Sequence, residues 1–303
     1  GMSAPLAAPA TIFSAPDDRT ATEPAEHRGL ARDQIRLLVA SPAGITHATF
    51  RELPDQLNRG DLLVVNTSGT LPAELDGSWR DGRPVVVHLA TDLRDGTWVA
   101  ELRTAPDAAA PVLDAAQGDQ VRLPGRARMR LLTPYPRPDS SPTGLGNRLW
   151  RVRIPGTTSV VSYLYRHGRP ISYGYLRNRY PLADYQTLFA TDPGSAEMPS
   201  AGRGFTRELV ERLVAGGVAV APITLHTGVS SQDVGEAPQA EWFSVPASTA
   251  NLVNSTRRSA GRVIAVGTTV TRALESAVTA GGGVAAITGW TSLVVEPSRG
   301  VRV

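Results

Sequence analysis

Cysteine and lysine are both absent from this sequence of 303 residues. Without cysteine the chain has no disulfide, no thiolate zinc site and no cysteine nucleophile. Without lysine it has no P-loop of the Gly-Lys-Ser/Thr type and no Schiff-base or lysine general-base mechanism. All 31 basic residues are therefore arginines, and 28 carboxylates balance them to a formal net charge of +3. This small positive charge is compatible with a polyanionic partner but does not indicate one.

Long hydrophobic runs and a recognisable targeting segment are also missing. No stretch approaches the ~18 apolar residues of a membrane-spanning helix, and the start lacks the basic region and apolar core of a secretory signal. We therefore predict a cytoplasmic protein with no membrane partner. The hydrophobic share of 41% provides a sizeable core, and the length suits two domains. Nothing in the sequence indicates an oligomeric state.

The chain divides into three kinds of sequence. Residues 1–28 are rich in Ala, Pro and Thr, which predicts a poorly ordered N-terminal arm. Between residues 71 and 155, short β-rich runs are separated by Asp-Gly, Gly-Asp and Pro-Gly turns, which predicts a small antiparallel barrel or sandwich. On either side of it, residues 29–70 and 156–303 alternate buried strands with amphipathic helices. We expect these two segments to form one layered α/β domain that is discontinuous in sequence.

The most informative local pattern is an apolar strand over residues 263–266 that runs into Gly267-Thr268-Thr269 and then a helix. Free amides at such a helix start, together with the two hydroxyls, can hold a carboxylate or a phosphate. Arg272 and Glu275 follow at i, i+3 spacing and share a face near that opening. The same pattern is equally that of a capped helix that carries a surface ion pair.

Three other segments place polar groups where a site could lie. His226 comes at the end of a predicted strand over residues 218–225, which is where α/β sheets place their sites. A lone histidine is more often structural, and the other four histidines lack even this context. Polar loops over residues 66–73 and 198–206 are natural walls of a cleft at a domain boundary. The run Gly281-Gly282-Gly283 fails the dinucleotide-binding pattern and predicts a loop.

Several segments, taken in order along the chain, carry a resemblance to a known family. The matching segments are residues 59–66, 185–190, Ser200-Ala201-Gly202, Phe205-Thr206, Thr224-Leu225-His226 with Gly228, Glu241-Trp242, and 261–269 with Arg272 and Leu274-Glu275-Ser276. Together they resemble the S-adenosylmethionine:tRNA ribosyltransferase-isomerases of queuosine biosynthesis. The similarity covers nearly the whole chain from about Glu23.

The resemblance implies a reaction, two substrates and a fold. The ribosyl moiety of S-adenosylmethionine is transferred and isomerised onto a 7-aminomethyl-7-deazaguanine base in tRNA, which gives epoxyqueuosine and releases adenine and methionine. S-adenosylmethionine is then a cosubstrate, no other cofactor and no metal is expected, and the anticodon arm of tRNA is the macromolecular partner. The implied fold class is α/β, with a three-layer α/β/α domain and an inserted antiparallel β-barrel domain.

The resemblance also implies roles for particular residues. His226 or Glu241 is expected to be the catalytic base, and Arg272 the partner of the methionine carboxylate. Thr268 and Thr269 are expected to contact an oxyanion or the ribose, and Glu275 is expected to orient Arg272. The complete set of predicted substrate-binding residues is Asn66, Thr67, Ser200, Gly202, Thr206, Thr224, Gly228, Gly267, Thr268, Thr269 and Arg272.

The chain departs from the family pattern at several of these loops. Thr67-Ser68-Gly69 stands where the family has Asp-Thr-Arg, and Arg203-Gly204 stands where it has Leu-His. The resemblance stops at Val303, ahead of a further segment typical of the family, which predicts a divergent member. Because polar losses at a buried site are rarely neutral, three hypotheses remain: the family's enzyme, an enzyme of the same fold with altered chemistry, or a non-catalytic RNA- or nucleoside-binding homologue.

The assignment of Arg272 yields a first prediction. Arg272→Ala is expected to raise the concentration of S-adenosylmethionine at half-saturation, because the variant has no cation for the methionine carboxylate. Steady-state kinetics with varied S-adenosylmethionine measures this. An unchanged value would remove Arg272 from the pocket.

Overall fold

The computed structural model describes residues 20–303 except 142–143, 173–175, 177 and 231–235. Most of the predicted arm over residues 1–28 lies outside the described residues. Its last part forms a short 3-10 helix, η2 (Ala25–Arg28), and buries Ala25. Within the described part of the chain, no helix is long and apolar enough to cross a membrane.

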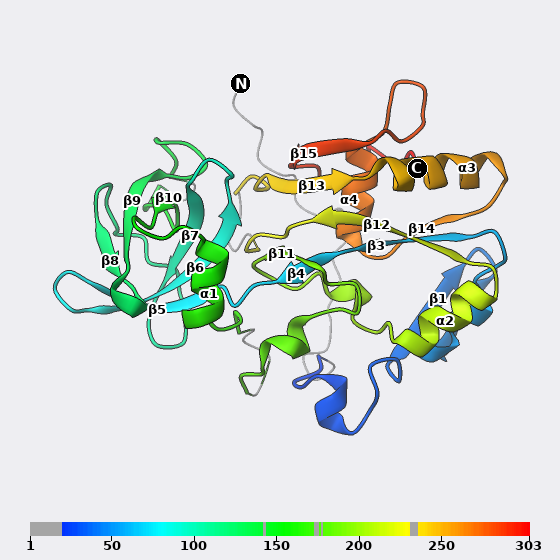
Figure 1. Cartoon of the computed structure of the whole chain (residues 1–303), viewed down its shortest axis with the longest axis horizontal. Helices are drawn as coiled ribbons and strands as arrows, with labels where there is room; N and C mark the ends of the chain where they lie inside the picture. The colour runs from blue at the N-terminus through cyan, green and yellow to red at the C-terminus, as the bar shows by residue number, and fades with distance from the viewer. Residues whose placement is uncertain (1–19, 142–143, 173–175, 177, 231–235) are drawn as a thin grey trace.

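A mixed five-stranded sheet forms the centre of one half of the molecule (Figure 1). Its strands, in spatial order, are β14 (Val263–Ala265), β3 (Leu62–Asn66), β12 (Ala219–Leu225), β13 (Glu241–Val245) and β15 (Ile287–Thr291). The strand β3 pairs in parallel with both of its neighbours. The pairs β12–β13 and β13–β15 are antiparallel. All five residues of β3 are buried, as expected for a strand covered on both faces.

Helices cover both faces of this sheet. They are α2 (Arg207–Ala215), α3 (Ala247–Arg258), α4 (Thr268–Ser276) and the 3-10 helix η3 (Phe50–Gln56). Successive side chains of β3 point to opposite faces. Leu62 and Val64 pack with residues of α3 and α4, such as Val253 and Val270, whereas Leu63 packs with α2 and η3. The predicted three-layer α/β/α arrangement is therefore confirmed. We call this half the layered part.

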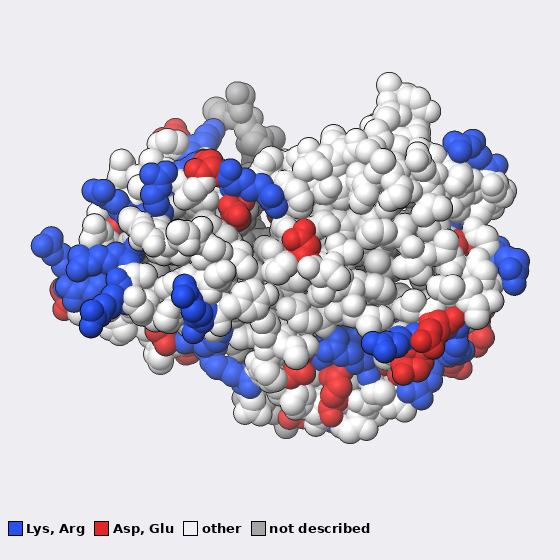
Figure 2. Space-filling model, in the orientation of Figure 1, with Lys and Arg blue, Asp and Glu red and all other residues white. Residues whose placement is uncertain are grey.

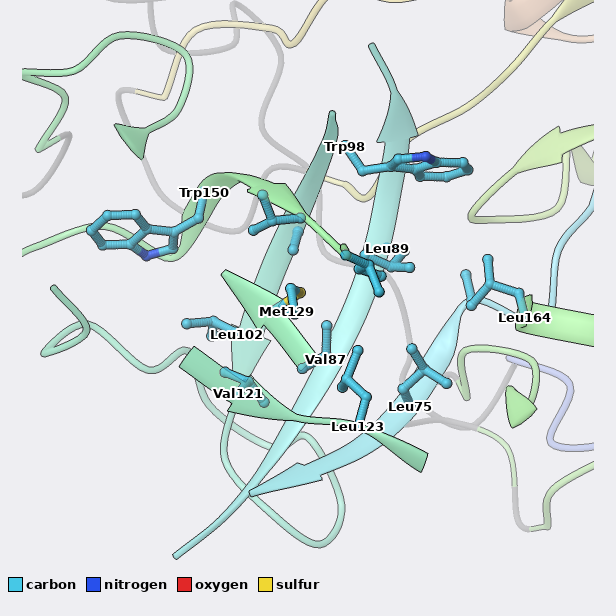
Figure 3. Packing of buried hydrophobic residues seen from close by; sticks show 14 of the residues in the cluster. Leu75, Val87, Leu89, Trp98, Leu102, Val121, Leu123, Met129, Trp150 and Leu164 are labelled. Atoms are coloured by element: carbon cyan, nitrogen blue, oxygen red, sulfur yellow. The ribbon is translucent and has the colours of Figure 1, made fainter. Parts of the chain in front are cut away.

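The other half is a closed antiparallel barrel (Figure 1). Its strands, in order around the barrel, are β10 (Leu149–Arg153), β7 (Trp98–Arg103), β6 (Pro84–Asp92), β5 (Glu74–Trp79), β8 (Gln120–Arg122) and β9 (Arg128–Pro134). Every second side chain, among them Leu75, Val87 and Met129, points inward and fills the interior (Figure 3). Leu164, from helix α1 (Val160–His167), packs into the same cluster. The pattern of short strands thus gives the barrel and not a sandwich.

The remaining elements are short. They are the hairpin β1 (Arg36–Ser41) with β2 (Gly44–Thr49), the parallel pair β4 (Ser68–Thr70) with β11 (Asp192–Ser195), and the 3-10 helices η4 (Pro124–Arg126), η5 (Leu182–Tyr185) and η6 (Ser200–Gly202). The strand β4 directly follows β3 and leads the chain into the barrel. The β4–β11 pair therefore lies where the layered part and the barrel meet.

A ladder of buried charges crosses the outer face of the barrel. Glu74, His88 and Glu101 are direct partners on β5, β6 and β7 and are each at most 5% exposed. His88 Nε2 lies 2.8 Å from Glu74, and its Nδ1 lies 3.2 Å from Glu101. Arg169 donates to Glu74 at 2.7 Å, and Arg148 donates to Glu101. Each buried charge thus has a partner of opposite sign, which such a ladder requires.

The ladder sets the protonation of its members. Burial lowers the pKa of His88, but hydrogen bonds to Glu101 and Glu74 outweigh burial and raise the pKa above its ordinary value. Burial raises the pKa of Glu74, but hydrogen bonds from His88 and Arg169 prevail and bring it to about 2. His88 is therefore an imidazolium that donates to both neighbours.

These shifts predict how stability depends on pH. Because folding raises the pKa of His88, its contribution is complete below the ordinary value of 6.5 and is lost as pH rises through the folded pKa. The free energy of unfolding, measured by urea denaturation, is expected to fall from pH 6.5 toward pH 9. His88→Asn should lose this His88-dependent fall and be less stable at pH 6 by about 3 kcal/mol, since two buried carboxylates lose their cation. His47→Asn, on the exposed β1–β2 hairpin, is the control; equal slopes in all three proteins would contradict the prediction.

Candidate active site between the barrel and the layered part

His226 lies directly after β12, at the carboxyl end of a central strand of the sheet. Its side chain is buried, and Nδ1 lies 2.7 Å from the hydroxyl of Ser68 on β4. One face of the imidazole stacks on Trp242, with the ring centroids 5.2 Å apart and an angle of 19° between the planes. The ring is therefore fixed from two directions by residues of the layered part and of the segment that leads to the barrel.

A small cavity of about 30 Å³ opens beside this imidazole. The layered part contributes His226 and Trp242 to its wall, and the barrel contributes Thr91, Arg94 and Trp98. The guanidinium of Arg94 lies 3.6 Å above the ring centroid of Trp242. Both halves of the molecule thus build the site, as is common for pockets at domain boundaries.

The surroundings of His226 keep its imidazole neutral. Burial lowers its pKa, the Asp192 carboxylate counteracts this, and the Arg94 guanidinium lowers the pKa further. The distance from Nε2 to Asp192 Oδ2 is 3.8 Å. Since the net effect is a pKa below the ordinary 6.5, the ring is unprotonated at pH 7. It can accept a proton there.

Glu241, at the start of β13, joins two other predicted residues. Its Oε2 accepts a hydrogen bond from the amide of Gly228 at 2.9 Å, and its Oε1 accepts one from Nη1 of Arg272. The Arg272 side chain is 22% exposed. Glu241 is therefore the group that orients Arg272.

The prediction that Glu275 orients Arg272 is wrong. Glu275 is buried and accepts hydrogen bonds from the amides of Arg302 and Val303 at 2.8 and 3.0 Å, and it pairs with Arg299 at 2.9 Å. The i, i+3 spacing places Arg272 and Glu275 on adjacent parts of α4. However, Glu275 turns toward the C-terminal segment, whereas Arg272 reaches across to β13.

Asn66 connects the strand ends beneath the site. Its Nδ2 donates to the carbonyl of Leu225 at 3.0 Å and to the hydroxyl of Thr269 at 3.2 Å, and its Oδ1 accepts from the amide of Leu225 at 3.1 Å. Next to it, the hydroxyls of Thr67 and Thr224 lie 2.8 Å apart. These four predicted residues do come together, but their polar atoms bind one another and so position the ends of β3, β12 and α4.

Ser200 and Gly202 lie on η6, which packs against the start of α4. Gly267 has φ +91°, and a Cβ there would come within 2.6 Å of the Ala201 Cβ, so only glycine fits. Thr268 is exposed in the first turn, and no side chain caps that helix end. Ser200 lines a second cavity of about 270 Å³, apart from the one beside His226.

Thr206 has a structural role in this arrangement. Its hydroxyl oxygen accepts a hydrogen bond from the amide of Leu209 at 3.2 Å and so caps α2. The same hydroxyl donates to Asp33 at 3.3 Å. Thr206 contributes to neither of the two cavities.

Sequence reasoning missed most of the residues that surround His226. Gly194 is the tightest of them, since a Cβ there would lie 2.4 Å from the imidazole. Trp242 had a signal, because it follows Glu241 in a matching pair of residues, and Ser68 lies in a loop that the sequence marks as polar. Arg94 lies in the β6–β7 turn of the barrel, and no pattern in the sequence marked it as a site residue. In the part of the chain that the structure describes, no group of three or more His, Asp or Glu side chains could hold a metal ion.

The fold and this site define a layered α/β protein with an inserted barrel and a basic imidazole where the two meet. The chain belongs to the queuosine biosynthesis protein family, whose model matches residues 11–303. The family predicted from the motifs is therefore confirmed.

Two individual relatives agree with this family, and one solved structure is similar to the chain. The S-adenosylmethionine:tRNA ribosyltransferase-isomerase of Thermus thermophilus is 34% identical over 304 residues, which cover 96% of this chain and 83% of that protein. The enzyme of the same name from Novosphingobium aromaticivorans is 34% identical over 308 residues, which cover 96% of this chain and 82% of that protein. A crystal structure of S-adenosylmethionine tRNA ribosyltransferase from Thermotoga maritima has 25% identity and a TM-score of 0.43, and the match covers 94% of this chain and 78% of that one.

The close approach of Gly194 to His226 yields a prediction. Gly194→Ala is expected to displace the imidazole and lower kcat about 100-fold, because a catalytic group misplaced by ~1 Å costs that much. Gly289→Ala is the matched control, since nothing lies within 4 Å of a Cβ at that position. Turnover and melting temperature are measured for both variants. Equal turnover numbers would show that the position of His226 does not matter.

Proposed function

We propose that this chain transfers and isomerises the ribosyl moiety of S-adenosylmethionine onto a 7-aminomethyl-7-deazaguanine base in tRNA. The products are epoxyqueuosine in the tRNA, adenine and methionine. The observation that carries the proposal is the neutral, buried imidazole of His226 facing a cavity between the barrel and the layered part. This imidazole lies in a chain 34% identical to enzymes named for that reaction over 96% of its length.

The reaction needs a base that removes a proton from the carbon beside the sulfonium. His226 suits this role because its imidazole is neutral at pH 7 and lies at the cavity. Glu241 suits it less well, since Arg272 and the amide of Gly228 already occupy its two oxygens. We therefore assign His226 as the base and Glu241 as a positioning residue for Arg272.

The start of α4 offers the methionine carboxylate a binding place. Arg272 uses Nη1 for Glu241, and a guanidinium carries further donors that a substrate carboxylate can accept from. The first amides of α4 have no partners within the helix, and Thr268 is exposed beside them. A helix N-terminus also favours negative charge. We assign Arg272, Thr268 and these amides to the carboxylate.

Two departures from the family pattern are accommodated in the structure. Ser68, within Thr67-Ser68-Gly69, provides the hydroxyl that contacts His226 Nδ1. Arg203 pairs with Glu26 at 2.8 Å and donates to the carbonyl of Asp184 at 2.9 Å. The side chains that stand at these positions thus have defined partners. This supports a working site and not a degenerate one.

We also propose that residues 71–155 form the inserted domain and that residues 29–70 with 156–303 form the discontinuous one. The barrel strands run from Glu74 to Arg153, within the first range. We also propose that the protein contacts the anticodon arm of tRNA. It then acts in the cytoplasm, where tRNA is found.

The test is release of adenine from S-adenosylmethionine in the presence of tRNA that carries the modified guanine. His226→Asn and His226→Gln are expected to lower kcat at least about 100-fold, the usual contribution of a general base. The rate of the unsubstituted protein should rise with pH through a pKa below 6.5, and this limb should vanish in both variants. His47→Asn, on the exposed hairpin, is the control.

Two outcomes would contradict the proposal. If the unsubstituted protein binds the modified tRNA but releases no adenine, the chain is a binding homologue and not an enzyme. If both His226 variants keep the rate and the pH limb of the unsubstituted protein, the base is another group.

A further inference from the structure

Four exposed arginines form one face on the outside of the barrel, which we call the arginine face. Arg122 on β8 is the direct partner of Arg128 on β9, and Arg130 on β9 is the direct partner of Arg153 on β10. All four side chains are exposed, whereas intervening residues such as Val121 point into the barrel. The register of three neighbouring strands thus gathers four guanidinium groups on one surface.

This arrangement is unfavourable for the free protein. Like charges that are directly opposite on neighbouring strands destabilise a sheet. In the described part of the chain, no ion pair includes Arg122, Arg128, Arg130 or Arg153, although carboxylates pair with many other arginines, such as Arg169. Because the whole chain carries only +3, this end of the barrel concentrates positive charge, which Figure 2 shows as a blue cluster. Uncompensated charge of this kind favours a polyanionic partner.

The neighbouring surface fits the same partner. An open hollow of about 650 Å³ adjoins Arg122 and Arg128, and Arg80 and Trp79 also line it. The two carboxylates of this hollow have other partners: Asp81 pairs with Arg83 at 2.7 Å, and Asp119 accepts from the amide of Ala116. The hollow still has a net positive charge, because its four arginines (Arg80, Arg83, Arg122 and Arg128) outnumber these two carboxylates.

Arginine side chains also continue from the arginine face toward the His226 cavity. Arg151 lies two residues before Arg153 on β10 and pairs with Asp95 in the β6–β7 turn at 2.8 Å. The same turn carries Arg94, whose guanidinium covers Trp242 at the cavity. A chain of arginines therefore links the outer face of the barrel to the candidate site.

We propose that the arginine face binds the phosphate backbone of the tRNA whose modified base enters the His226 cavity, an inference that rests on the proposed function. Guanidinium groups bind phosphate oxygens in bidentate fashion. Contacts to phosphates fix the register of a nucleic acid without reading its sequence. The barrel is thus the part that holds the RNA, while the end of the sheet carries out the chemistry.

The experiment measures the dissociation constant of a fluorescently labelled, unmodified tRNA transcript by anisotropy between 50 and 200 mM salt. R128Q/R130Q is compared with R207Q/R258Q, which removes the same charge from two exposed arginines of the layered part. At about 0.1 M salt the first variant should bind at least about tenfold more weakly, with a salt slope smaller by roughly 1 to 2. The control should change less than about threefold.

Two further readouts separate binding from folding. R128Q/R130Q should melt at the same or a higher temperature, because it removes a like-charge repulsion. Its half-saturation for S-adenosylmethionine should equal that of the unsubstituted protein.

Several results would overturn the inference. If the unsubstituted protein releases adenine and both double variants bind tRNA equally well, the arginine face is not the RNA surface, and the proposed function stands. The same conclusion follows if R128Q/R130Q loses binding to vesicles of anionic phospholipid but keeps tRNA binding. If the unsubstituted protein neither binds tRNA nor releases adenine, the proposed function fails as well.

Discussion

The side-chain amide of Asn66 holds together the strand ends on which the candidate site is built. It satisfies both the amide and the carbonyl of Leu225, the residue before His226, and it contacts Thr269 at the start of α4. These groups are buried, and buried backbone groups without partners cost ~1–3 kcal/mol each. A hydrophobic residue at position 66 would leave them unpaired, so this amide helps to place the backbone that carries His226. The polar loop after β3 therefore has a structural role, because it connects the ends of β12 and α4, in addition to its proposed role in binding.

The barrel completes the site that the sheet begins. Arg94 covers the ring of Trp242 and lowers the pKa of the neighbouring His226, so a turn of the barrel tunes a group of the layered part. The buried ladder of Glu74, His88 and Glu101 provides the barrel with a polar outer face that Arg148 and Arg169 cover. Because buried ion pairs tolerate little displacement, this ladder restricts how the covering segments lie against the barrel.

Local patterns in the sequence predicted the elements well and the contacts between them less well. The apolar strand before Gly267 and the amphipathic helix after Thr206 were predictable because hydrophobic period and capping are local properties. His226 was predictable as a strand-end residue for the same reason. Gly194 and Arg94 were not, since they reach His226 and Trp242 only through the packing of β11 and the barrel against the sheet. Glu275 was assigned wrongly because helical spacing gives the face of a side chain but not the partner it meets.

The insertion of the barrel also sets an order for synthesis. The strand β3 leaves the ribosome before the barrel, whereas its neighbours β12 and β14 follow the barrel. Leu225, whose carbonyl accepts the hydrogen bond from Asn66, is synthesised 159 residues after Asn66. The barrel strands pair mostly with near neighbours in the chain, so the barrel can close while β3 is still alone. Five residues that end up fully covered are thus exposed to solvent during translation. An apolar strand exposed in this way is prone to aggregation until the second half of the sheet is synthesised.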